Sequence, residues 1–278
     1  MSKTDTSKKN VAYMGPPTSF SNQAALHRFP ENANFIPCES INEVFEIVEN
    51  GSVDFGVVPV ENSNEGMVSH TLDMFIKSNV KIVAEIFLDI HLNLLSNAEL
   101  DKITTVYTIP IAFAQCKEWF RKNLPDVKHI ATYSTAHAAK MVSGMENSAA
   151  VASELASKMY GLNILGCAIE DYAQNTTRFL VISNNVSPKT DCSKTSLLFA
   201  IKDSAGALYD ALKPFSEAKI NLSKIESRPN KVQAWEYFFF VDLIGHIDDE
   251  NVCNALKKVK DHCDSVKILG SYPYYPDL

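Results

Sequence analysis

The sequence predicts an α/β protein in two parts, a two-lobed cleft region followed by a small ferredoxin-like domain. Three observations support this prediction. Short β-prone segments alternate with helical segments over the first part of the chain, which is the pattern of parallel sheets covered by helices. A polar stretch at 184–193 then indicates a linker. Beyond it the elements follow the order β-α-β-β-α-β, which matches a ferredoxin-like sandwich.

The elements of the first lobe follow from apolar runs and capping signals. Residues 54–60 form a nearly continuous apolar run, which is typical of a parallel strand buried on both faces. Ser40 and Glu43 have the spacing of a capping box and predict a helix that ends at Asn50 and Gly51. Further strands are predicted at 11–14 and 35–38, and further helices at 21–28 and 68–77.

The second lobe continues the same alternation. Charged and polar residues interrupt the apolar stretch 80–95, so it predicts strands rather than a membrane helix. Pro110 suits the first turn of a helix that reaches Asn123, and Ser134 can cap a helix through Val142. The remaining strands are predicted at 105–109, 129–133, 149–152, 163–168 and 179–182, with a helix at 153–160. Long strands near 80–95 and 170–182 predict two connections between the lobes, with a small-ligand cleft between them.

The small domain is expected between residues 194 and 273. Its strands are predicted at 195–201, 222–227, 235–243 and 266–270, and its helices at 205–218 and 249–262. The segment 235–243 is rich in aromatic residues and is strongly β-prone, so we expect it to lie in the middle of its sheet.

Composition and charge restrict the class of protein. A formal net charge of −7 without a basic stripe argues against nucleic-acid binding. The six cysteines form no Cys-x-x-Cys pair, and no histidine pair has metal-ligand spacing, so we expect reduced thiols and no metal. Residues 1–10 are polar and unlike a secretory signal, and we predict a flexible tail there. The chain is therefore expected to be soluble and cytoplasmic, without a membrane partner.

Polar residues gather at three places where a strand ends and a helix begins. These segments are 15–21, 58–66 and 133–136. Helix N-termini there offer unpaired N–H groups and a dipole that favours anions. Each segment alone would also be explained by ordinary helix capping. Three of them in one cleft fold indicate a small anionic ligand.

A fourth polar segment, Asn175-Thr176-Thr177-Arg178-Phe179, lies at the mouth of a strand. Because side chains alternate along a strand, Asn175 and Thr177 would share one face, and Thr176 and Arg178 the other. Arg178 could therefore contact the ligand, or it could tie the lobe together through a salt bridge. The sequence leaves both interpretations open.

These segments together resemble prephenate dehydratase with its C-terminal ACT regulatory domain. The resemblance rests on Gly15-Pro16 with Phe20-Ser21, Val58-Pro59-Val60-Glu61-Asn62-Ser63, Thr177-Arg178-Phe179, Gly206-Ala207-Leu208 and Glu226-Ser227-Arg228-Pro229. It covers nearly the whole chain from residue 11 onward. It implies a two-lobed, periplasmic-binding-protein-like (type II) catalytic domain at 11–184 and a ferredoxin-like βαββαβ ACT domain at 194–273.

The activity that the resemblance implies is the decarboxylative dehydration of prephenate to phenylpyruvate in L-phenylalanine biosynthesis. Thr177 would donate a hydrogen bond to the departing hydroxyl, with Asn62 as the second catalytic residue. No metal or organic cofactor is implied. The substrate-binding residues would be Ser21, Ser63, Ser134, Thr135, Asn175, Arg178 and Phe179.

The resemblance also implies allosteric inhibition by L-phenylalanine. The effector would bind between ACT domains of two subunits, so a homo-oligomer, a dimer or a tetramer, is expected. The alternative for this domain is a purely structural dimerisation role. The effector-binding residues would be Gly206, Ala207, Leu208, Asn221, Leu222, Ser223, Glu226, Ser227, Arg228 and Pro229.

The chain departs from the family pattern at two places. Thr18 stands where the family usually has glycine, which would strain the backbone if φ is positive there. Ile109 and Ile111 flank Pro110 where the family usually has His-Pro-Gln, and the glutamine is expected in the active site. The two isoleucines leave a catalytically impaired small-molecule sensor open as an alternative. An arogenate dehydratase also stays open, because arogenate differs from prephenate only in its side chain.

Overall fold

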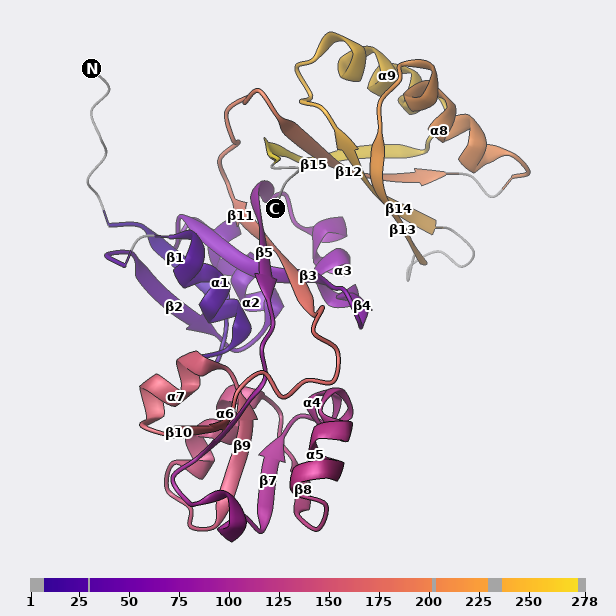
Figure 1. The fold of residues 1–278 in the computed structure, drawn as a ribbon. Helices are drawn as coiled ribbons and strands as arrows, with labels where there is room; N and C mark the ends of the chain where they lie inside the picture. Colours follow the sequence, from indigo (N-terminus) through magenta and orange to yellow (C-terminus); the bar gives the residue numbers. More distant parts are fainter. Residues whose placement is uncertain (1–7, 30, 202–203, 230–236, 275–278) are drawn as a thin grey trace. The chain divides into compact units, whose positions relative to one another are not determined.

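The structure is a computed structural model, and it describes residues 8–29, 31–201, 204–229 and 237–274. The described strands form three sheets, and helices alternate with strands as an α/β fold requires (Figure 1). By packing, the chain divides into two compact units. The first holds Met1–Val44, Val57–Val68 and Ile86–Phe179, and the second holds Phe45–Gly56, Ser69–Glu85 and Leu180–Leu278.

The first sheet has the order β2-β1-β3-β11-β5, and the short β4 pairs with β3. Ser40 caps the helix α2 by accepting the amide of Glu43 at 3.2 Å, while the Glu43 carboxylate accepts the amide of Glu39. The capping signal is therefore confirmed. The bounds are β1 Asn10–Met14, α1 Phe20–Arg28, β2 Asn34–Cys38, α2 Ile41–Glu49, β3 Phe55–Asn62, β4 Gly66–Met67, α3 Ser69–Lys77, β5 Lys81–Asp89 and β11 Thr176–Ser183.

The second sheet has the order β10-β6-β9-β7-β8. We predicted parallel pairing, and this is right for β7 with β8 and β9, but β6 runs antiparallel to both β9 and β10. Strands β9 and β10 keep the β-α-β order through α7, and β6 is inserted between them in the antiparallel direction. The bounds are β6 Asn93–Ser96, η1 Leu100–Lys102, β7 Thr105–Thr108, α4 Pro110–Gln115, α5 Lys117–Asn123, β8 Lys128–Ala131, α6 Thr135–Val142, β9 Ser148–Ala152, α7 Glu154–Tyr160 and β10 Asn163–Gly166.

The single helix predicted at 110–123 is two helices, α4 and α5. The chain leaves helical geometry at Cys116, where φ is −112° and ψ is 17°. The Asp171 carboxylate accepts the amides of Glu118 and Trp119 at 3.0 to 3.3 Å. Helix α5 thus has its own satisfied N-terminus. This contact with a residue far along the chain explains why the break was not visible in the sequence.

The third sheet has the order β13-β14-β12-β15, so the predicted central position of β14 is confirmed. Residues 235 and 236 of the predicted strand lie outside the described residues. Helices α8 and α9 cover one face of the sheet, over a core that includes Phe199, Phe215 and Val241 (Figure 1). The bounds are β12 Ser193–Ile201, α8 Ala207–Glu217, β13 Leu222–Pro229, β14 Tyr237–Ile244, α9 Glu250–Asp261 and β15 Ser265–Pro273.

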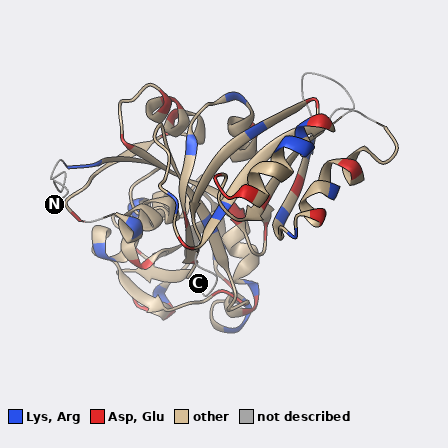
Figure 2. Ribbon diagram, turned by 90° about the horizontal axis from the view of Figure 1, so that it is seen from above, with Lys and Arg blue, Asp and Glu red and all other residues tan. Residues whose placement is uncertain are grey.

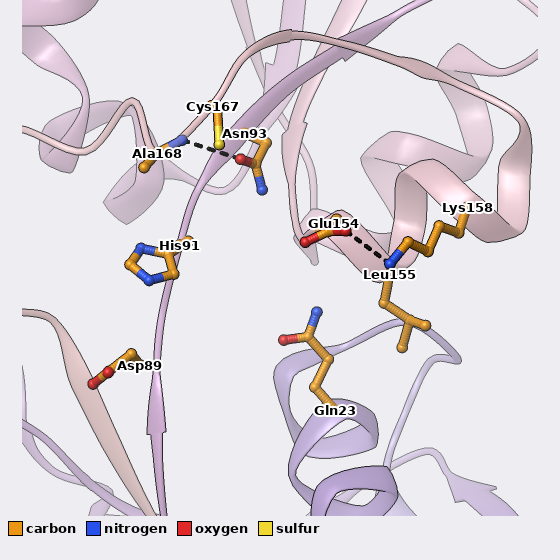
Figure 3. Close-up of a pocket in the computed structure, with 9 residues that line it drawn as sticks. All are labelled: Gln23, Asp89, His91, Asn93, Glu154, Leu155, Lys158, Cys167 and Ala168. Atoms are coloured by element: carbon orange, nitrogen blue, oxygen red, sulfur yellow. Dashed lines mark hydrogen bonds and ion pairs between the residues drawn. The ribbon is translucent and has the colours of Figure 1, made fainter. Parts of the chain in front are cut away.

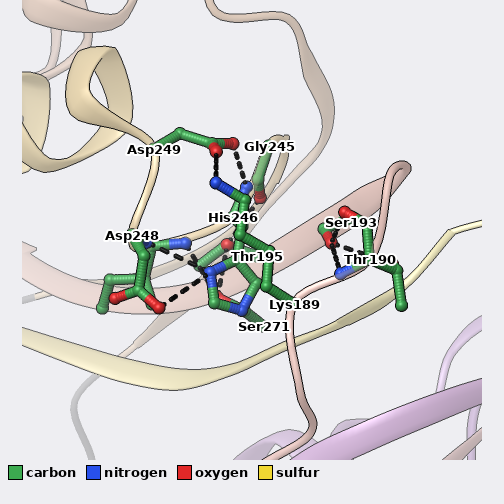
Figure 4. A network of polar contacts seen from close by, with 10 residues as sticks. Lys189, Thr190, Ser193, Thr195, Gly245, His246, Asp248, Asp249 and Ser271 are labelled. Atoms are coloured by element: carbon green, nitrogen blue, oxygen red, sulfur yellow. Dashed lines mark hydrogen bonds and ion pairs between the residues drawn. The ribbon is translucent and has the colours of Figure 1, made fainter.

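Polar contacts fix the linker to this third sheet (Figure 4). Lys189 forms an ion pair with Asp249 at 2.5 Å, and Asp249 also accepts the amide of His246 at 2.7 Å. The hydrogen bond from Lys189 holds the pKa of the Asp249 carboxyl below its usual value. Nearby, Thr195 bonds to Ser271 at 2.7 Å. The end of the predicted linker, at Ser193, is already the first residue of β12.

The opposite face of the third sheet meets β5. A Cβ at Gly270 would overlap the backbone of Ile82, so only glycine permits this approach of β15. Lys81 donates to the carbonyl of Ile268 at 2.9 Å. Lys194 and Glu85 form a buried ion pair at 2.7 Å. Strand β5 is thus joined to this sheet by backbone packing, a hydrogen bond and an ion pair.

The N-terminal segment, the charged residues and the cysteines were the subject of the remaining expectations about the chain. Asn10 opens β1, and residues 1–7 of the predicted tail lie outside the described residues. No described helix is long and apolar enough to cross a membrane. Basic and acidic residues are interspersed along the described chain (Figure 2). All six cysteines are free, and burial raises the pKa of Cys116 to about 12.

Candidate active site

Asn62, the last residue of β3, is the centre of a hydrogen-bond network. Its Nδ2 donates to Asn175 Oδ1 and to Thr177 Oγ1, both at 2.8 Å. Its Oδ1 accepts the backbone amides of Asn64 and Glu65 at 3.0 and 3.1 Å. Because backbone amides can only donate, the orientation of the Asn62 amide is determined.

This orientation determines what Thr177 can do. The hydroxyl oxygen of Thr177 accepts from Asn62, so its own hydrogen remains to be donated elsewhere. Thr177 is 9% exposed and lies on β11, next to Asn175 in the alternation of side chains. The side chain is therefore suited to donate a hydrogen bond to a bound ligand.

The alternation of faces predicted for Asn175, Thr176 and Thr177 is confirmed. Thr176 points away from the Asn62 amide, and its hydroxyl donates to Asp89 Oδ1 at 2.7 Å. Ser63 forms two hydrogen bonds with Thr176. The Ser63 amide donates to the Thr176 carbonyl at 2.9 Å, and the Ser63 hydroxyl oxygen accepts from the Thr176 amide at 3.0 Å. The Ser63 side chain thus holds β3 and β11 in register.

Gln115 completes the network, and sequence reasoning did not identify it. Its Nε2 donates to Glu65 Oε1 at 3.0 Å, and its Oε1 lies 3.5 Å from Asn175 Nδ2. Gln115 ends helix α4, one turn after Ile111 on the same helix. Positions four apart share a helix face, so this spacing was the signal that could have revealed it.

The two other predicted segments are helix N-termini. Ser19 caps α1 by accepting the amide of Asn22 at 3.2 Å, and Ser21 lies buried in the first turn. Ser134 caps α6 by accepting the amide of His137 at 3.0 Å, which leaves Thr135 as the first helical residue. The Ser134 hydroxyl oxygen is thus used as a cap, as the ordinary-capping interpretation expects.

Thr18 has the strained backbone that its departure from glycine made possible. Its φ is +71°, and its side chain is fully buried. Its amide donates to Asn22 Oδ1 at 3.0 Å, and its carbonyl accepts from the Ser153 hydroxyl at 2.9 Å. The Thr18 hydroxyl itself has no hydrogen-bond partner among the described residues.

The remaining residues of the fourth segment are buried. Arg178 is 7% exposed and Phe179 is 1% exposed, so Phe179 has the position of a core residue. His137 stacks on Tyr133 with ring centroids 4.1 Å apart, which agrees with a packing role for this histidine.

A cavity of about 440 Å³ lies beside the network (Figure 3). Gln23 of α1 and Glu154 of α7 face it, with Asp89 and His91 from the segment around the end of β5. Asp89 connects it to the network through Thr176. Asn62 and Thr177 do not line it, so the site is assigned from its hydrogen bonds. No described cluster of His, Cys, Asp and Glu could hold a metal ion.

Comparison with known families shows to which family the chain belongs. A family model for prephenate dehydratase matches residues 11–187, and one for the ACT domain matches residues 195–261. The chain belongs to the prephenate dehydratase family. The ACT domain follows the dehydratase domain, in the order that the sequence motifs predicted.

Three relatives show how far the similarity to this family extends. A bifunctional chorismate mutase/prephenate dehydratase of Aquifex aeolicus is 49% identical over 96% of this chain and 74% of its own length. A prephenate dehydratase of Methanocaldococcus jannaschii is 40% identical over 96% of this chain and 99% of its own length. An arogenate dehydratase/prephenate dehydratase of Arabidopsis thaliana is 36% identical over 96% and 73%.

Solved structures agree on the fold. A prephenate dehydratase of Arthrobacter aurescens in complex with L-Phe has a TM-score of 0.88 and 32% identity, and covers 95% of this chain and 90% of its own. A protein described as a quorum-quenching acylase, GqqA, has a TM-score of 0.87 and 29% identity. The match covers 97% of this chain and 99% of that chain. Because one fold can host several reactions, the activity has to be argued from the site.

The predicted effector residues of the ACT domain lie in two places. Gly206 precedes α8 with a φ of +87°, a conformation that favours glycine. Residues 222 and 223 and residues 226–229 lie along β13, the edge strand beside β14, and Asn221 precedes it. The Asn221 carbonyl accepts the amide of Ile244 at 2.9 Å.

Proposed function

We propose that this chain catalyses the decarboxylative dehydration of prephenate to phenylpyruvate. The bond from the ring to the departing carboxylate breaks, and its electron pair enters the ring as the hydroxyl leaves. With one proton taken up, the products are phenylpyruvate, carbon dioxide and water. Aromatisation drives this reaction, so the protein mainly has to orient the substrate and assist the leaving hydroxyl.

The observation that carries the proposal is the hydrogen bond that the Asn62 side-chain amide donates to the Thr177 hydroxyl oxygen. Asn62 donates to Thr177 Oγ1, which directs the threonine hydrogen toward a ligand and stabilises negative charge that develops on this oxygen. A threonine hydroxyl is too weak an acid to transfer its proton freely. It therefore acts as a positioned hydrogen-bond donor to the leaving oxygen.

The two carboxylates of prephenate need donors, and the proposed donors come from helix N-termini and polar side chains. The amides at the start of α1 and α6 suit an anion. Gln115 joins the site by its bonds to Glu65 and Asn175, and supplies an amide although residue 111 is isoleucine. The other residues proposed to bind substrate are Ser21, Ser63, Ser134, Thr135, Asn175 and Arg178, whereas Phe179 is placed in the core.

Steady-state kinetics with purified protein test this proposal. Thr177→Val removes the hydroxyl with little change in volume, and should lower kcat about a hundredfold or more. Thr177→Ser keeps the hydroxyl and should retain most of the activity. Equal activity in the valine variant would exclude Thr177 from this role. Circular dichroism confirms that both variants are folded.

The choice between prephenate and arogenate is settled by supplying each to the wild-type protein. These substrates differ only in the side chain, and the Arabidopsis relative carries both activities in its name. Phenylpyruvate or phenylalanine would be the respective product. Binding of L-phenylalanine without product from either substrate would instead indicate a small-molecule sensor.

The ACT domain is proposed to bind L-phenylalanine and inhibit the reaction. The left-handed Gly206 and the start of α8 leave backbone amides for a carboxylate. Leu208 belongs to this first predicted segment, and Asn221 opens the second, before β13. The proposed division places the dehydratase domain at 11–184 and the ACT domain at 194–273. A homo-oligomer and a cytoplasmic location stay predictions, which light scattering and cell fractionation would test.

A further inference from the structure

Helix α3 is held at both ends by strands of the ACT sheet. At its C-terminal end, the Lys267 ammonium of β15 donates to the carbonyls of Phe75 and Ser78 at 2.8 and 2.6 Å, and lies 3.4 Å from that of Ile76. A cation at this end complements the helix dipole and satisfies carbonyls that lack an intrahelical partner.

The other end of α3 contacts residues 226–229 of β13, the predicted effector segment that is called the effector motif below. Arg228 of β13 donates from Nη1 to Ser69 Oγ at 2.9 Å and from Nη2 to Asp73 Oδ1 at 3.2 Å. Ser69 is the first residue of α3, and Asp73 lies one turn later. The Arg228 and Asp73 side chains are 18% and 19% exposed, so this pair is only partly screened by solvent.

The arrangement of Arg228 is incomplete, which allows a second state. Its Nε is buried and has no hydrogen-bond partner among the described residues. A buried donor without a partner is energetically unfavourable. A rearrangement of the motif that offers Nε an acceptor would therefore compete with the present contacts to α3.

The first turn of α3 is tied closely to Asn62 along the chain. Strand β4 folds back on β3, so that Gly66 pairs with Asn62 and Met67 with Glu61. The amide of Val68 then donates to the carbonyl of Val60 at 2.9 Å, directly before Ser69. These backbone bonds hold residues 66–68 on β3, directly before the first turn of α3. A displacement of that turn would therefore act on Gly66, the residue paired with Asn62.

We propose that Arg228 is a positioning residue, which couples the effector motif to the reaction site through Asp73 and helix α3. Effector binding at residues 226–229 changes the hold of Arg228 on the first turn of α3, and the β3–β4 hairpin transmits the change to Asn62. The inference rests on the proposed function, because it assigns a route to the inhibition. Such coupling requires that the effector favour one of two states of this contact.

Hydrogen-exchange mass spectrometry of the full chain, with and without L-phenylalanine, tests the route without relying on turnover. In the wild type, the effector should change exchange both at residues 206–229 and at residues 62–77. Asp73→Asn should keep the first response and lose the second. Asp73→Glu retains the charge and should restore it. Glu217→Gln is the matched control, because it removes an exposed charge in the same domain.

The same variants are then assayed for inhibition of phenylpyruvate formation. Asp73→Asn should raise the L-phenylalanine concentration for half-inhibition about fivefold or more, with uninhibited kcat/KM within about threefold of wild type. Asp73→Glu and Glu217→Gln should both show the wild-type L-phenylalanine concentration for half-inhibition and the wild-type kcat/KM.

Three outcomes would overturn the inference. One is an unchanged response at 62–77 in Asp73→Asn. Another is a wild-type response at 206–229 without one at 62–77, which refutes the route but leaves the effector site intact. The third is no wild-type response at 206–229, which refutes the proposed effector site itself and removes the route with it.

Discussion

Replacing either member of the Glu85–Lys194 ion pair should destabilise the chain strongly, whereas replacing both should not. The ammonium lies 2.7 and 3.0 Å from the two carboxylate oxygens, and the side chains are 5% and 6% exposed. At the shorter distance the attraction is about 6 kcal/mol for an effective dielectric constant of about 20. Loss of hydration costs a comparable amount, so the pair contributes little net free energy. Removing one partner leaves a buried charge and should cost about 3–5 kcal/mol.

Urea unfolding of Glu85→Leu, Lys194→Met and the double variant measures these free energies. The Tyr274 ring centroid lies 4.4 Å from the Lys194 ammonium, and this cation–π contact should keep the cost of Glu85→Leu near the lower end of the range. The double variant should unfold within about 1 kcal/mol of wild type. Glu154→Gln is the control, since its 2.7 Å pair with Lys158 is exposed, and its unfolding midpoint should not move. Single variants as stable as the wild type would refute the reasoning, because they would show that solvent screens the pair.

Three further predictions concern strain, the site and acid stability. Thr18→Gly should leave the free energy of unfolding unchanged or raise it by about 1 kcal/mol in urea, because it relieves a positive φ and removes a buried hydroxyl without a partner; a clear loss of stability would contradict this. Gln115→Ala should lower kcat/KM about tenfold or more, whereas Ile111→Gln should change it less than about threefold, because Gln115 already supplies an amide; the reverse order would show that residue 111 decides turnover. Lys189 lowers the pKa of Asp249, so the stability from this carboxylate is complete above its unfolded pKa of about 4 and is lost as the pH falls through the lower folded pKa. The stability difference between wild type and Asp249→Asn in urea should therefore be constant above about pH 5 and shrink in acid, and growth in acid would refute the assignment.

Features set by neighbouring residues were predictable from the sequence. Ser134 caps α6 and Ser40 caps α2, because a cap involves residues three apart. The strain at Thr18 was expected from the resemblance, which places glycine at this position, on the condition that φ is positive there. The alternation of Thr176 and Thr177 followed from strand geometry once the segment was taken as extended.

Features that depend on distant contacts were not predictable in the same way. The bonds of Gln115 to Glu65 and Asn175 join residues 50 and 60 positions apart. The antiparallel pairing of β6 with β9 likewise depends on which strands meet, because an isolated strand pattern carries no direction. The resemblance drew attention to position 111, while the structure shows the amide one turn later on the same helix. Sequence reasoning therefore identified two of the segments that meet in the Asn62 network, but not Gln115.

The close approach at Gly270 limits how regulatory domains could be exchanged between proteins of this kind. Strand β15 passes so near Ile82 that a side chain at position 270 would meet the backbone of β5. A transplanted domain would need glycine at this point, even if it carried a suitable effector motif. Without it, the backbone of the foreign sheet would be held away from Ile82, and the packing of β15 against β5 would be lost.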